Sequence, residues 1–138
     1  MGEFTALVAA NSLTFENALK IVTKRAELMQ NAVPNNEGGM AAIIGLKDKE
    51  VIDICKQEQG EGVLQAVNFN SPGQVVIAGS KSILEKSLES FKHAGAKRAI
   101  LLSVSVPSHC KLMEPASILF SNYLNQVNFD MPNFPIIQ

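Results

Sequence analysis

The sequence has two cysteines, little aromatic residue content and almost no net charge, and each shortage excludes a class of protein. Cys55 and Cys110 have no C-x-x-C spacing, so we expect neither a disulfide scaffold nor a zinc site. A net charge of −1 and 6% aromatic residues supply no basic stripe and no base-stacking surface, which excludes nucleic acid as a partner. No apolar run approaches the roughly 18 residues of a membrane helix. No signal-peptide pattern is present either, so we expect a cytoplasmic protein without a membrane segment.

The composition that remains is that of a folded chain. Hydrophobic residues make up 46% of the sequence and charged residues 18%, which is typical of a globular protein. The 138 residues are enough for one domain, or for a small domain with a fragment of another.

The first residues, 2–10, are typical of a helix that follows a tight strand-to-helix turn. In nucleophile-elbow enzymes such a turn carries a serine in the pattern G-x-S-x-G. The chain begins at the position of the last glycine of that pattern, Gly2. This interpretation predicts an acyl-transferring enzyme whose nucleophile is not in the chain.

Helix and linker signals follow this segment. A helix over 15–32 is predicted, capped by Ser12 or Thr14 and stopped by Pro34. The polar, glycine-bearing stretch 35–39 is then the best candidate for a domain boundary.

After the linker, the hydrophobic pattern predicts the order β-α-β-β-α-β. The expected strands are 40–46, 63–68, 74–78 and 97–104, and the expected helices are 48–58 and 81–95, the second capped by Ser80. This is the split βαβ order of a ferredoxin-like sandwich. A last helix is predicted over 113–127, and 134–138 resembles the start of a strand, so both ends look cut from a larger fold.

Arg25 is the first candidate for chemistry. The predicted apolar seam of the helix is Phe15, Ala18, Leu19, Val22, Ala26 and Met29. Arg25 lies three residues after Val22 and four before Met29, so we expect it on that inward face. An inward arginine must be paired, because an isolated buried charge is costly. It is therefore a structural ion pair, an edge residue whose stem covers apolar surface, or a bidentate clamp for a substrate carboxylate.

His109 is the second candidate, because it stands between a predicted strand and a predicted helix. A neutral imidazole there could take a proton from a hydroxyl nucleophile, and the alternative is a helix-entry histidine without a special role. Cys110 is interpreted as a packed small residue, because sequence neighbours rarely point their side chains at each other. His93 is expected at a helix C-terminus.

The segment 68–74 is the third candidate. Turn residues alone explain its Asn, Ser, Pro and Gly content. Asn68 and Asn70, on either side of a phenylalanine, could instead line a cleft and offer amide hydrogen bonds. The segment is not a phosphate loop, because the glycine spacing and the lysine are missing.

Together these segments resemble the bacterial malonyl-CoA:acyl carrier protein transacylases. The resemblance lies in 2–8, Arg25 with Met29 and Gln30, 39–46, 68–79, 94–99 and 103–113, in that order along nearly the whole chain. No single segment is specific, but the combination is.

The resemblance implies a fold and a division of the chain. The family fold is an α/β-hydrolase-type core with an inserted ferredoxin-like subdomain. Residues 39–104 would be the insert, 1–38 helices of the core, and 105–138 the return to the core. The expected fold class is therefore α+β or α/β.

The resemblance also implies a reaction and its residues. His109 matches the catalytic histidine and Arg25 the arginine that binds the malonyl carboxylate, while Met29, Asn68 and Asn70 match pocket positions. The implied enzyme transfers malonyl from malonyl-CoA to the acyl carrier protein through a serine acyl-enzyme, without metal or cofactor. The family's Gly-His-Ser-Leu-Gly elbow would place its serine before residue 1, so we expect this chain alone to be inactive.

Two other hypotheses remain from the residues. One is a non-catalytic ferredoxin-like module that binds an acyl carrier protein or another protein. The other is an unrelated α+β ligand-binding domain, which explains the element order but not the contexts of Arg25 and His109. If the chain is an incomplete core, uncovered apolar helix faces should make it self-associate.

Overall fold

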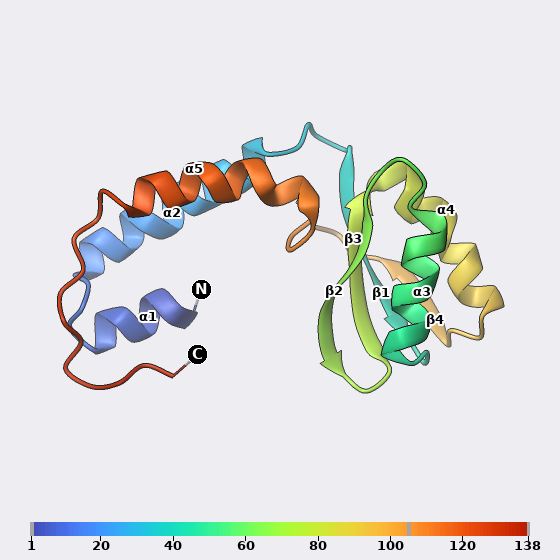
Figure 1. Cartoon of the computed structure of the whole chain (residues 1–138), viewed down its shortest axis with the longest axis horizontal. Helices are drawn as coiled ribbons and strands as arrows, with labels where there is room; N and C mark the ends of the chain where they lie inside the picture. The colour runs from blue at the N-terminus through green and yellow to red at the C-terminus, as the bar shows by residue number, and fades with distance from the viewer. Residues whose placement is uncertain (1, 105, 138) are drawn as a thin grey trace. The chain divides into compact units, whose positions relative to one another are not determined.

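The chain is α+β (Figure 1). The computed structural model describes residues 2–104 and 106–137 and, within them, a four-stranded antiparallel sheet and five α-helices. Contacts divide the chain into a first compact unit, residues 1–28 with 116–138, and a second, residues 29–115. Each unit is described by itself. In the described part of the chain, no helix has the length and apolar character needed to cross a membrane.

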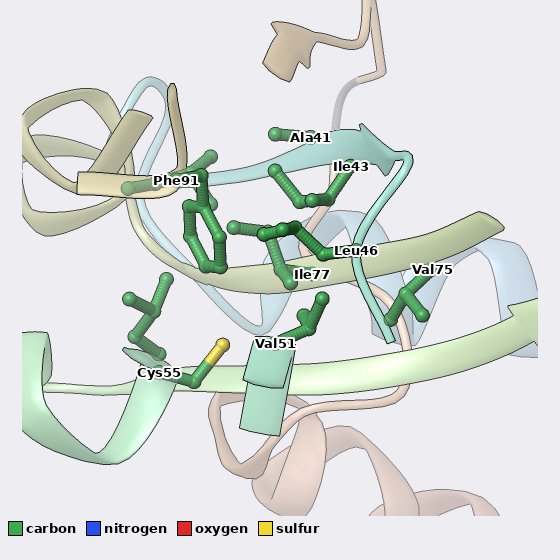
Figure 2. Packing of buried hydrophobic residues seen from close by; sticks show 10 residues of the cluster. Ala41, Ile43, Leu46, Val51, Cys55, Val75, Ile77 and Phe91 are labelled. Atoms are coloured by element: carbon green, nitrogen blue, oxygen red, sulfur yellow. The ribbon is translucent and has the colours of Figure 1, made fainter. Parts of the chain in front are cut away.

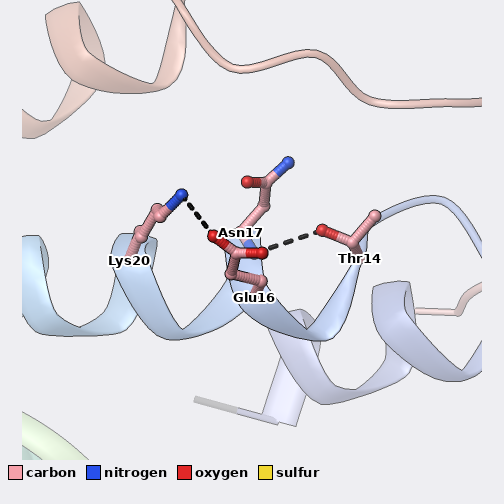
Figure 3. Close-up of polar contacts among 4 residues, drawn as sticks. All are labelled: Thr14, Glu16, Asn17 and Lys20. Atoms are coloured by element: carbon pink, nitrogen blue, oxygen red, sulfur yellow. Dashed lines mark hydrogen bonds and ion pairs between the residues drawn. The ribbon is translucent and has the colours of Figure 1, made fainter.

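Three helices belong wholly or mainly to the first unit: α1 (Gly2–Ala9), α2 (Phe15–Asn31) and α5 (Glu114–Leu124). The Thr14 hydroxyl oxygen accepts a hydrogen bond of 3.2 Å from the backbone N–H of Asn17, so Thr14 caps α2 (Figure 3). The other cap candidate, Ser12, donates its hydroxyl proton to the backbone oxygen of Asp130 at 2.6 Å instead. This bond ties the C-terminal segment to the turn between α1 and α2.

The core of the first unit corrects the predicted seam of α2. The helix buries Ala18 and Ile21, whereas Phe15 and Leu19 are 68% and 49% exposed. Partly buried partners come from α1 and α5: Phe4, Leu7, Val8, Phe120, Tyr123 and Leu124. Apolar residues lie on more than one side of α2, so the sequence alone could not select the side that meets its neighbours.

The sheet of the second unit is formed by β1 (Gly38–Ile44), β2 (Leu64–Ser71), β3 (Gln74–Ser80) and β4 (Arg98–Leu101), with α3 (Asp48–Glu58) after β1 and α4 (Lys81–His93) after β3. The predicted element order is confirmed. The spatial order is β2-β3-β1-β4, and every neighbouring pair is antiparallel. Each helix therefore joins two strands that are separated by a third.

Some predicted element ends are wrong. The strand expected over 97–104 is only Arg98–Leu101, and the helix expected over 113–127 is α5, preceded by the short 3-10 helix η1 (Lys111–Met113). Residues 134–137 form no strand. Ser80 occupies the N-cap position of α4, but its hydroxyl accepts the N–H of Val63 at 3.4 Å rather than capping the helix. Met1, Ser105 and Gln138, which fall within predicted segments, lie outside the described residues.

Both helices of the second unit cover the same face of the sheet (Figure 1). Phe91 of α4 and Val51 of α3 pack there against Ile77 of β3 (Figure 2). Gly95 ends α4 with a φ of 97°, as its place after the helix predicts. The opposite face of the sheet is covered in part by Cys110 and by Leu112 of η1. This face therefore supports the turn that carries His109.

Candidate active site

His109 has a left-handed backbone conformation, with a φ of 66°, in the turn before η1. Its side chain is exposed. Such a conformation costs a residue other than glycine about 1–3 kcal/mol and is enriched at functional sites. Two asparagines, Asn11 and Asn36, also have positive φ, but asparagine tolerates this region better than most residues.

The turn that carries His109 is fixed to the sheet on its N-terminal side. Pro107 is fully buried, and it lies so close to Gly38 of β1 that a Cβ there would be 2.5 Å from the proline Cγ. The Cys110 thiol donates a hydrogen bond of 3.2 Å to the backbone oxygen of Pro107 and closes the turn. The turn is thus anchored by buried residues on both sides of the exposed imidazole.

Cys110 is a packing residue, as the sequence indicates. It is buried with Met40, Val76 and Ala78 on the sheet face opposite the helices. Burial raises the pKa of the Cys110 thiol, although backbone hydrogen bonds act in the other direction. A thiol that stays protonated is a poor nucleophile, so the geometry does not support a Cys110–His109 catalytic pair.

Asn68 and Asn70 lie near the end of β2. Asn68 is half-buried and faces Val76 across the strand pair, and since Val76 packs with Cys110, Asn68 lies on the same sheet face as the histidine turn. Asn70 is exposed next to the tight Pro72–Gly73 turn. Register shifts between Ala66 and Asn68 and again between Phe69 and Ser71 mark local bulges, which re-aim side chains.

Arg25 and Met29 are both half-buried on α2. Within the described residues, Arg25 has no ion-pair partner, so the structural ion pair considered above is not found there. Arg25 belongs to the first unit, whereas Met29, Asn68, Asn70 and His109 belong to the second. The site residues are therefore described unit by unit.

The sequence analysis missed Gln65. Its Oε1 accepts a hydrogen bond of 2.8 Å from the backbone N–H of Lys111, the first residue of η1. The two residues are 46 positions apart, and Gln65 stands in an ordinary strand pattern, so no local signal could have found it. Among the described residues, no group of three or more His, Cys, Asp or Glu side chains could hold a metal ion.

The whole chain, residues 1–138, matches the family of the acyl transferase domain. The protein therefore belongs to the acyl transferase domain family. The left-handed His109 and the half-buried Arg25 thus lie in a chain of that family.

Within that class, the chain is similar to malonyl transacylases. It is 49% identical to the malonyl CoA-acyl carrier protein transacylase of Haemophilus influenzae over 137 aligned residues. The alignment covers 99% of this chain and 44% of that protein. The solved structure of the malonyl CoA-acyl carrier protein transacylase from Coxiella burnetii matches with a TM-score of 0.91 and 44% identity over 97% of this chain and 42% of that one.

A third match is a structure described as a type II PKS acyl-carrier protein in complex with its malonyl-transacylase. It has a TM-score of 0.92 and 47% identity over 96% of this chain and 43% of that one. The family resemblance seen in the sequence is thus confirmed, and the chain spans about 44% of the length of the curated relatives it matches.

Proposed function

We propose that the protein transfers a malonyl group from malonyl-CoA to the phosphopantetheine thiol of an acyl carrier protein. The observation that carries this proposal is the match of the entire chain to the acyl transferase domain, together with 49% identity to a malonyl transacylase. Malonyl-CoA is the substrate, no further cofactor takes part, and the reaction takes place in the cytoplasm.

The proposed division of the chain follows the same family. Residues 39–104 form a ferredoxin-like subdomain between the core segments 1–38 and 105–138. The element order β-α-β-β-α-β and the strand order β2-β3-β1-β4 support this assignment, because the split βαβ fold has that order of elements.

His109 is the proposed general base. Its imidazole accepts the proton of a serine hydroxyl as the serine oxygen attacks the thioester carbonyl, and the imidazolium returns that proton to the departing CoA sulfur. The carrier thiol then gives its proton to the imidazole and attacks the malonyl-serine ester, and the imidazolium returns that proton to the departing serine oxygen. The exposed side chain on a fixed turn supports this role.

Arg25 is proposed to bind the free carboxylate of the malonyl group. A guanidinium binds a carboxylate in a bidentate way, which a lysine does not reproduce. The half-buried position of Arg25 and its lack of an ion-pair partner among the described residues support this role. Met29, Asn68 and Asn70 are proposed to line the pocket, with the asparagine amides as hydrogen-bond donors.

The experiment that tests the function measures malonyl transfer by the complete gene product that contains these residues, with malonyl-CoA and holo acyl carrier protein. His109→Asn should lower kcat by a factor of about a thousand or more, and it should fold, because asparagine accepts a positive φ. His93→Asn, at the exposed end of α4, is the control and should keep full activity.

Two results would contradict the proposal. Full activity of His109→Asn would remove the histidine from the mechanism. A wild-type protein that binds the carrier without transferring malonyl would favour a non-catalytic module instead. The 138-residue chain on its own is expected to be inactive, because the serine implied by the resemblance is not among its residues.

Arg25→Ala tests the substrate class. It should raise KM for malonyl-CoA and reduce the preference for malonyl-CoA over acetyl-CoA by about tenfold or more, since a charge-assisted hydrogen-bond pair is lost. Lys24→Ala is the matched control, because Lys24 is the adjacent cation and pairs with Glu27 at 3.6 Å. Steady-state kinetics with both thioesters decide the outcome, and an unchanged preference in Arg25→Ala would contradict the role.

A further inference from the structure

The left-handed conformation of His109 needs a restraint from outside the residue. A residue other than glycine stays in this region only when the surrounding structure fixes it. The imidazole is exposed and makes no hydrogen bond within the described residues. The restraint must therefore come from the residues on either side of His109.

On the N-terminal side, packing supplies the restraint. Pro107 is fully buried against Gly38 of β1, and its backbone oxygen accepts the hydrogen bond from the Cys110 thiol. This contact fixes where the turn enters. It does not by itself fix the start of η1 at Lys111.

On the C-terminal side, the buried Cys110 packs against the sheet, and a hydrogen bond to Gln65 of β2 adds a second restraint. Lys111 begins η1, and the N-cap residue Cys110 makes no side-chain capping bond. The first N–H groups of a helix have no partner within the helix. Gln65 fills this need, because its Oε1 accepts the Lys111 N–H at 2.8 Å.

Gln65 is well placed for this task. It lies on β2 opposite Ala78, which packs with Cys110, so Gln65 is on the same sheet face as the histidine turn. The same strand carries Asn68, three residues further along. One strand, β2, thus carries both a candidate pocket residue and the side chain that binds the turn.

We propose that Gln65 is a positioning residue, which holds His109 through the Lys111 amide in the conformation from which the imidazole accepts the serine proton. This inference rests on the proposed malonyl transfer. It assigns the control of the imidazole position to an uncharged side chain on β2, which touches neither the substrate nor the imidazole.

The test compares four variants of the complete gene product. Gln65→Leu removes the acceptor at similar volume, Gln65→Asn keeps the amide but shortens its reach, and Gln65→Glu keeps an acceptor at the same reach. Gln59→Leu is the matched control, since Gln59 is also a half-buried glutamine of the second unit and has no side-chain hydrogen bond within the described residues.

The expected result is a split between kcat and KM. Gln65→Leu and Gln65→Asn should lower kcat by about tenfold to a hundredfold, as a small misplacement of a reacting group does. KM for malonyl-CoA should stay unchanged, because no substrate contact is lost. Gln65→Glu and Gln59→Leu should stay close to wild type, and rates are expressed per folded protein so that a merely structural loss does not count.

Two outcomes overturn the inference and are distinguishable. If the wild-type protein transfers malonyl and both Gln65→Leu and Gln65→Asn keep its kcat, the positioning role is wrong while the function stands. If the wild-type protein itself does not transfer malonyl, the proposed function fails, and the inference fails with it. If Gln65→Leu does not fold, Gln65→Asn alone decides.

Discussion

His109 and Cys110 are adjacent in the chain but lie in opposite environments. The imidazole is exposed on a left-handed residue, whereas the thiol is buried and its pKa is raised by burial. The exposed imidazole is therefore accessible from solvent, while the next residue anchors the turn. The sequence predicted the packing role of Cys110 from residue type and position, but it could not predict the backbone conformation of His109.

The second cysteine gives a prediction of pH dependence. Burial raises the pKa of the Cys55 thiol from 9.0 to about 12, so above pH 9 the unfolded chain loses this proton while the folded chain keeps it. The contribution of Cys55 to stability is therefore complete below pH 9 and decreases by about 1 kcal/mol per pH unit above it.

Denaturant unfolding of wild type and Cys55→Ala at pH 8 and pH 10 measures this effect. The mutant should lose less stability than wild type between the two pH values, because it lacks the thiol that titrates in the unfolded chain. Equal losses in both proteins would show that Cys55 does not contribute to the pH dependence.

At the scale of elements, the sequence predicted what local patterns determine. The order of strands and helices after the linker, the cap at Thr14 and the stop at Gly95 all follow from residue type and spacing. The sequence was wrong about the buried side of α2 and about the bond made by the Ser80 hydroxyl. Both features depend on which distant segment of the chain packs against the residue, and local periodicity does not contain that information.

The contact between β1 and the histidine turn gives a prediction at this scale. Gly38→Ala places a methyl group 2.5 Å from the Pro107 Cγ, so either β1 or the turn must move. The change should lower the free energy of unfolding by about 1–3 kcal/mol, as overpacking does. It should also lower malonyl transfer by the complete protein, because the turn carries His109.

Gly2→Ala is the control for this change, since a Cβ at Gly2 meets no atom within 4 Å. Its stability should stay equal to wild type or rise slightly, because alanine favours the helix that begins there. Chemical unfolding compares the two variants. A Gly38→Ala protein with wild-type stability and wild-type transfer would show that the Pro107 contact relaxes without cost.

At the scale of the whole molecule, membership of the family is indicated by many segments together and not by any single motif. The resemblance read from ordered segments agrees with the match of all 138 residues to the acyl transferase domain. The candidate site is different in this respect. The sequence indicated Arg25 and His109 individually, but only the structure assigns them to different compact units. The Gln65–Lys111 bond, across 46 residues, is equally a property of the folded chain.

The first unit gives the prediction that belongs to this scale. An apolar groove of about 350 Å³ lies between α1 and α2 and is lined by Phe4, Thr5, Val8, Ala9, Phe15, Ala18, Leu19 and Val22. Exposed apolar surface of this kind favours association, so the 138-residue chain on its own should form dimers or larger species.

Light scattering after size exclusion, at several concentrations, tests this association. Leu19→Lys places a charge in the groove and should shift the chain toward monomer, because a buried unpaired ammonium is costly. Ile118→Lys is the control, since Ile118 is 57% exposed on α5 and does not line the groove, and it should associate like wild type. A wild-type chain that stays monomeric at every concentration would contradict association, and an equal shift in both variants would locate it outside the groove.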